Sequence, residues 1–143
     1  MSTYRQTATI AYDTAARAVA LAMEVGASRG VKPVVAVADP AMTLIAYGVA
    51  DGATPHSAET SRRKAATAAS TRRRTALIPE ALAIALPLGT GGILTTVDGG
   101  VPIFFDDVHV GGLGVAGGTP AQDAEIALEV LKRLGARTEG AGL

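Results

Sequence analysis

A glycine-rich stretch from Gly99 to Asp123 limits most strongly how this chain can fold. It holds one apolar run from Ile103 to Phe105 and a second from Val108 to Val115, with an acidic pair between them. Two apolar runs joined by a turn-forming pair are typical of a β-hairpin. The second predicted strand leads directly into a predicted helix, so the chain must combine a sheet with helices.

Three residues mark the start of that helix. Thr119 suits the N-cap, Pro120 suits the first helical position because its missing N–H costs nothing there, and Gln122 completes a capping-box pattern. Gly117 and Gly118 come just before, where free backbone N–H groups and the positive end of the helix dipole can hold a carboxylate or a phosphate. The alternative is a tight strand-to-helix turn that binds no ligand.

Apolar periodicity and turn residues predict the other elements. These are helices at 6–29, 58–74, 80–86 and 120–134, strands at 34–38, 43–49 and 93–97, and an N-cap at Ser57. The strands have short connections suited to hairpins, which favours a mainly antiparallel sheet with helices packed on it over a parallel dinucleotide-binding fold. We expect one domain over residues 1–143, with its core at about 6–135 and a frayed tail at 136–143.

Composition excludes several classes of partner. Thirteen basic and thirteen acidic residues cancel, so no overall charge attracts nucleic acid or a membrane surface. The chain has no cysteine, and it shows neither a secretory leader nor a long apolar span, which predicts a cytoplasmic protein. Two histidines are too few for a metal site built on several imidazoles.

The predicted helix at 58–74 concentrates positive charge. It carries six of the thirteen cations, which are Arg62, Arg63, Lys64, Arg72, Arg73 and Arg74. Such a helix serves either as an anion site or as a solvated face or subunit contact. Lys64 lies beside alanines, where it suits a base or a carboxylate anchor, and the alternative is a structural ion pair with Asp123.

The two histidines differ in their predicted surroundings. His56 lies in a loop just before a helix, where a neutral ring can act as a base or an axial iron ligand; the alternative is a merely exposed side chain. His109 lies within a predicted strand and should point away from Val108 and Val110.

Five motifs together resemble the GlcG/HbpS-like haem-binding (haem-degrading) domain, which also forms the C-terminal domain of PduO-type proteins. The motifs are Val35–Asp39, Asp51–Ala53, Lys64–Ala68, Gly99–Ile103 and Gly112–Asp123. The resemblance implies an α/β (α+β) fold, a three-layer α/β/α sandwich with a five-stranded antiparallel sheet, profilin-like in outline. It also implies haem or tetrapyrrole binding and homo-oligomers from tetramer to octamer.

The chain departs from the family pattern at three points. Asp39-Pro40-Ala41-Met42 stands where the family usually has Asp-x-Gly-Gly, Val49 stands where an arginine usually follows, and Ala116 stands where the family usually has serine. The first predicted helix carries no histidine, so the axial iron candidates are His56, His109, Met42 and Tyr47.

Three functional hypotheses follow. The first is a small oligomeric protein that binds haem, another tetrapyrrole or another carboxylate-bearing ligand, with His56 on the iron. The second is a cofactor-free isomerase, lyase or hydrolase acting on a small organic acid, with His56 or Lys64 as base. The third is an assembly module whose basic helix is a subunit interface. The predicted ligand-binding residues are Tyr47, His56, Arg62, Arg63, Lys64, Gly114, Gly117, Gly118, Thr119 and Asp123.

Overall fold

The computed structural model describes all residues from 1 to 143. Its helices are α1 (Tyr12–Ser28), α2 (Ser57–Thr71), α3 (Ala85–Gly89) and α4 (Pro120–Leu134), with short 3₁₀ turns at Thr75–Leu77 and Glu80–Leu82. Its strands are β1 (Val34–Ala38), β2 (Leu44–Val49), β3 (Gly100–Phe105) and β4 (Val108–Ala116). The two predicted hairpins and the last helix are confirmed.

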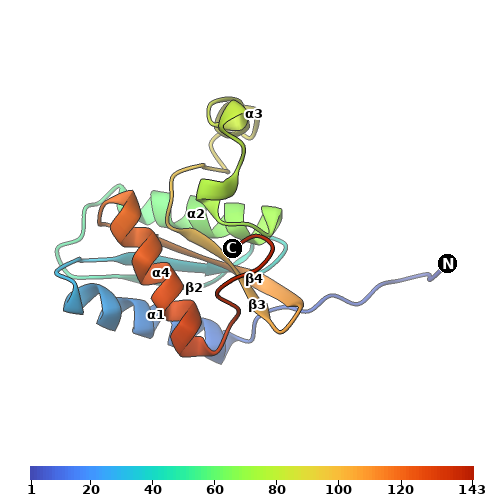
Figure 1. Ribbon diagram of the computed structural model, residues 1–143, viewed down its shortest axis with the longest axis horizontal. Helices are drawn as coiled ribbons and strands as arrows, with labels where there is room; N and C mark the ends of the chain where they lie inside the picture. Colours follow the sequence, from blue (N-terminus) through green and yellow to red (C-terminus); the bar gives the residue numbers. More distant parts are fainter.

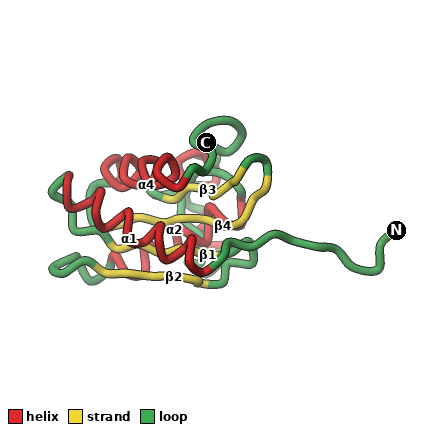
Figure 2. Tube along the Cα trace, turned by 90° about the horizontal axis from the view of Figure 1, so that it is seen from below, coloured by secondary structure: helices red, strands yellow, loops and turns green.

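The four strands form one antiparallel sheet in the order β2-β1-β4-β3. Helices α1 and α4 cover one face of this sheet and α2 covers the other, which gives three layers (Figures 1 and 2). The short helix α3 projects away from these layers (Figure 1).

The predicted fifth strand, at 93–97, is wrong. Gly91 and Gly92 both adopt left-handed backbone angles, which turn the chain away from an extended path. The backbone N–H of Thr95 then donates to the Thr67 hydroxyl of α2 at 2.9 Å. The segment therefore lies over α2 as a loop, and no strand of the sheet pairs with it.

The face under α1 and α4 is filled by aliphatic side chains, most of them branched. The sheet contributes Val35, Val37, Val101, Ile103, Leu113 and Val115, and the two helices contribute Ala15, Ala18, Ala22, Val25, Ile126, Val130 and Leu131. All of these side chains are essentially inaccessible to water. This layer holds most of the apolar area that folding removes from water.

The face under α2 is built from glycine and alanine. A Cβ atom added to Gly112 would meet backbone atoms of Ala65 and Ala69, and one added to Gly114 would meet the Ser61 carbonyl oxygen. Since only glycine leaves room there, these residues let the backbone of α2 approach the sheet closely. Packing against α2 therefore explains why β4 has glycine at positions 112 and 114, and no ligand is needed to account for them.

Several boundaries differ from the predicted ones. Helix α1 begins at Tyr12 rather than residue 6, because the chain before it is extended and the Ile10 N–H donates to the Val110 carbonyl at 3.0 Å. Helix α2 begins at Ser57, so His56 rather than Ser57 is its N-cap residue. Pro87 lies within α3 instead of ending a helix, in the first turn where proline is tolerated.

The C-terminal residues are tied to the rest of the molecule, whereas we expected them to fray. The Arg137 N–H donates to the Phe104 carbonyl at 2.9 Å, and the Arg74 N–H donates to the Gly142 carbonyl at 2.7 Å. Leu143 packs against the core. Among the helices, none combines the length and the apolar character that crossing a membrane requires.

Candidate functional site

The glycine turn before α4 uses its backbone donors internally. Thr119 and Gln122 form the predicted capping box, in which each side chain accepts a hydrogen bond from the other residue's backbone N–H, at 3.2 and 2.9 Å. The Gly118 N–H donates to Oδ1 of Asp123 at 2.9 Å. The carboxylate that this turn holds is therefore the chain's own Asp123, and not one supplied by a ligand.

Lys64 and Asp123 form a buried ion pair between α2 and α4. Their Nζ and Oδ2 atoms are 2.9 Å apart, and both side chains are almost fully buried. The lysine also donates to the Val115 carbonyl at 2.9 Å. A Cβ atom added to Gly99 would come within 3 Å of both side chains, so this glycine leaves space for the pair at the end of the sheet. The structural ion pair with Asp123, which was the alternative predicted for Lys64, is observed.

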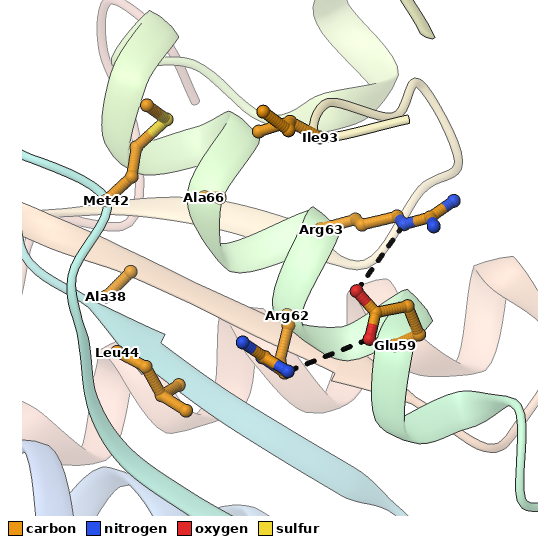
Figure 3. A pocket seen from close by; sticks show the side chains of 8 residues that line it. All are labelled: Ala38, Met42, Leu44, Glu59, Arg62, Arg63, Ala66 and Ile93. Carbon is orange, nitrogen blue, oxygen red and sulfur yellow. Dashed lines mark ion pairs between the residues drawn. The ribbon is translucent and has the colours of Figure 1, made fainter. Parts of the chain in front are cut away.

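A small open pocket lies where the outer face of α2 meets the β2 edge of the sheet (Figure 3). It has a volume of about 220 Å³ and is lined by Ala38, Met42, Leu44, Glu59, Arg62, Arg63, Ala66 and Ile93. Two of the predicted ligand-binding residues, Arg62 and Arg63, therefore lie together beside an apolar surface. Met42, one of the predicted axial candidates, lines the same pocket from the β1–β2 turn, where its φ of 65° is left-handed.

Glu59 lies between the two arginines. Its carboxylate is 3.7 Å from Nη1 of Arg62 and 3.8 Å from Nε of Arg63, and all three side chains are about half exposed (Figure 3). One carboxylate faces two guanidinium groups, so the pocket keeps a net positive charge. Long, exposed pairs of this kind are weak and leave the arginines free to turn toward another anion.

The other predicted site residues lie outside this pocket. His56 is exposed at the start of α2, and Tyr47 is exposed on the edge strand β2. Gly117 and Gly118 line a separate pocket of about 210 Å³ with Gly52 and Lys32. Arg62 and Arg63 thus lie in a different pocket from the glycine turn, whereas the first hypothesis combined them into one site. Among the cations of α2, Lys64 is joined to this turn through Asp123.

His109 is buried on β4 and takes part in no hydrogen bond through either ring nitrogen. Its ring packs against Phe104 with the centroids 5.1 Å apart. Burial lowers the pKa of His109 below the usual 6.5, the positive charge of Arg72 lowers it further, and the nearby backbone of Gly111 offsets part of this decrease. The ring is therefore neutral near pH 7.

The sequence did not point to Lys32 or Glu59 as site residues. Lys32 lies two residues before the buried strand β1, and its terminal atoms lie close to Gly52 across the pocket at the glycine turn. No sequence pattern links Lys32 with Gly52. Glu59 lies three residues before Arg62 and four before Arg63, and on a helix this spacing could have predicted the two ion pairs.

Residues 10–132 match the family described as haem degrading protein HbpS-like. None of the curated proteins matches the chain. Among solved structures, protein ORFY of Klebsiella pneumoniae is 27% identical, with a TM-score of 0.89 over 94% of this chain and 96% of its own. HbpS is 30% identical, with a TM-score of 0.84 over 93% of this chain and 95% of its own.

A third solved structure shares the fold. It is the PduOC:heme complex, which is 23% identical and has a TM-score of 0.85 over 92% of this chain and 99% of its own.

Proposed function

The chain belongs to the HbpS-like haem-degrading family, and on this premise we propose that it binds haem, or another tetrapyrrole that carries carboxylates, in the pocket between α2 and β2. The observation that carries the proposal is the pair Arg62 and Arg63 beside an apolar surface, with one carboxylate between them. The complex of PduOC with haem, in a chain of the same fold, is consistent with it.

The charges of the pocket suit a dicarboxylate. Arginine binds carboxylates through paired N–H groups, and its charge does not depend on pH in the working range. Two propionates would replace Glu59 as the partners of Arg62 and Arg63, and an exposed ion pair costs little to break. The arginines would thus fix the orientation of the ligand at the rim of the pocket.

The apolar wall suits one face of a macrocycle. Ala38, Leu44 and Ala66 form a surface of small and aliphatic side chains, with Met42 and Ile93 beside it (Figure 3). Bound haem would supply an iron atom that accepts axial ligands from the protein. The Met42 thioether and the Glu59 carboxylate are the groups in this lining that can coordinate iron, and we assign the iron contact to Met42 in place of His56, which lies outside the lining.

We also propose that the chain forms a homo-oligomer, between tetramer and octamer. Strand β2 is an edge of the sheet, and its residues Leu44, Tyr47 and Val49 are between 40% and 53% exposed. An edge strand with exposed apolar side chains readily pairs with another chain. A second copy at this edge would cover the open side of the pocket.

Titration of the purified protein with haemin tests the proposal. We expect a saturable shift of the Soret band, and an affinity at least about tenfold lower in Arg62→Ala/Arg63→Ala, since each charge-assisted hydrogen bond contributes about 1.5–3 kcal/mol. The matched control is Arg72→Ala/Arg73→Ala, which removes the same charge from the other end of α2 and should bind normally.

Two single variants test the iron ligand in the same titration. Met42→Leu should change the band positions of the bound haem, whereas His56→Ala should leave them unchanged. Sedimentation of the protein with and without bound haemin measures the number of subunits in the oligomer. Normal binding by Arg62→Ala/Arg63→Ala would refute the site, and a spectral change confined to His56→Ala would refute the assignment of Met42.

A further inference from the structure

A second pocket lies at the C-terminal end of α2 and shares no residue with the one proposed for haem. Its volume is about 440 Å³, and its lining is Thr71, Arg72, Arg73, Leu77, Phe104, Arg137, Ala141 and Gly142. Three guanidinium groups therefore border one space. The C-terminal segment closes one side of it, because the Arg74 N–H donates to the Gly142 carbonyl.

These three arginines have little negative charge to balance them. Neither Arg72 nor Arg73 takes part in an ion pair or a side-chain hydrogen bond. The nearest carboxylate to Arg137 is Asp107 at 3.7 Å, and that residue is fully exposed on the β3–β4 turn. Asp98 pairs with Arg74 at 3.5 Å. The pocket therefore keeps a surplus of positive charge.

Two contacts fix the position of the Arg137 guanidinium beside the pocket. Its guanidinium lies 3.9 Å from the centroid of the Phe104 ring, and Nη2 donates to the Ala141 carbonyl at 2.8 Å. Its Nε atom, like that of the neighbouring Arg74, is buried without a hydrogen-bond acceptor. A buried donor without an acceptor is costly, so Nε of Arg137, which lines the pocket, is a donor that an added acceptor would satisfy.

The region behind the pocket supplies no compensating charge. His109 packs on Phe104, its ring nitrogens have no partner, and the charge of Arg72 is one cause of its lowered pKa. An anion in the pocket would screen that charge and make protonation of His109 easier.

We infer that this pocket binds a small oxyanion carrying two or more negative charges, either a phosphate group or a compact polycarboxylate. Guanidinium groups match both chemistries through paired N–H donors. Leu77 and Phe104 add an apolar wall that suits a short organic portion of the ligand. This inference does not depend on haem binding, because the two lining sets are disjoint.

Proton NMR titration of the two histidines tests the inference. We would record the ring C–H signals against pH in chloride, in inorganic phosphate and in citrate, at one ionic strength. We expect phosphate or citrate to raise the pKa of His109 in a saturable way. His56, at the opposite end of α2, serves as the internal reference and should not move.

Two double variants, each of which removes two positive charges, distinguish anion binding in this pocket from binding in the other one. Arg72→Ala/Arg73→Ala should weaken the anion affinity that the shift of His109 reports at least about tenfold. Arg62→Ala/Arg63→Ala should keep this shift and its affinity, because Arg62 and Arg63 line the other pocket. A response to phosphate alone or to citrate alone assigns the ligand class.

Three results would overturn the inference: no saturable response to either anion, an equal shift of His56, or an unchanged response in Arg72→Ala/Arg73→Ala. None of them bears on haemin binding, which is measured through the Soret band. The two proposals can therefore fail separately.

Discussion

The two faces of the sheet are packed by opposite means. Under α1 and α4, branched side chains such as Val37, Leu113 and Leu131 fill the space between helix and strand. Under α2, glycines and alanines such as Gly112 and Ala65 bring the helix backbone against the strands. The first face depends on buried apolar volume, and the second depends on the absence of side chains.

This difference explains where the pockets with arginines lie. A helix that sits directly on the sheet leaves no room beneath it for a ligand, so ligands are limited to its margins. Both pockets lined by arginines lie along α2, one beside β2 and one beyond Thr71. The side chains under α1 and α4 contribute to stability by apolar burial, whereas the charged side chains lie along α2.

Asp123→Asn should have the largest effect, because the pair Lys64–Asp123 joins the two faces. The substitution leaves the lysine ammonium buried without a counter-charge, which costs about 3–5 kcal/mol of unfolding free energy. Urea unfolding measures the loss. The control is Glu125→Gln on the same helix, whose exposed pair with Arg29 should be worth no more than about 1 kcal/mol. Equal losses in the two variants would show that the faces are not joined here.

Gly114→Ala should have the second largest effect and tests the face under α2 directly. The added methyl group meets the backbone of Ser61 and Ala65, so α2 must move, at a cost of about 1–3 kcal/mol. The same substitution at Gly89, where nothing lies within 4 Å, should change stability by less than about 0.5 kcal/mol. Thermal unfolding of both variants compares them. Two unchanged proteins would mean that α2 is not in close contact with the sheet.

His109 should give the smallest effect, a dependence of stability on pH. Its pKa in the folded protein lies below the 6.5 of the unfolded chain, so the unfolded state binds the proton first. This contribution is therefore present above about pH 6.5, and it is lost as the pH falls from there through the folded-state pKa.

The contribution of His109 to stability is measured from the urea midpoints of His109→Gln and the native protein. These midpoints are compared between about pH 8 and about pH 5. The variant should lose less stability on acidification than the native protein does. Gly89→Ala, which changes no titratable group, is the control and should follow the native curve. Parallel curves for His109→Gln and the native protein would refute the shift.

Local signals in the sequence predicted most of the elements. The capping box of Thr119 and Gln122 fixed the start of α4, and Gly135 marked its end with a left-handed backbone at φ 74°. The hairpin over residues 34–49 and the one closed by Asp106–Asp107 formed as predicted. Each of these signals acts between residues close in the chain, so no tertiary information is needed to recognise them.

Signals that depend on distant partners were less reliable. The apolar run at 93–97 had the composition of a strand, but a strand needs a neighbour, and Thr95 found its acceptor on α2 instead. The glycines before α4 looked like an anion site, but Asp123 folds back to use the Gly118 N–H. In both cases the competing partner was not visible in the local pattern.

By itself, the amino-acid sequence determined the sheet with its helices, the capped start of α4 and the concentration of positive charge on one helix. Only the tertiary structure decided which cations are free to bind. Lys64 is buried against Asp123, Arg62 and Arg63 share Glu59, and Arg72 and Arg73 form no ion pair. The reason is physical: whether a charge is available depends on the burial and the counter-charges that distant segments bring to it, and on α2 those segments include β4, α4 and the C-terminal residues.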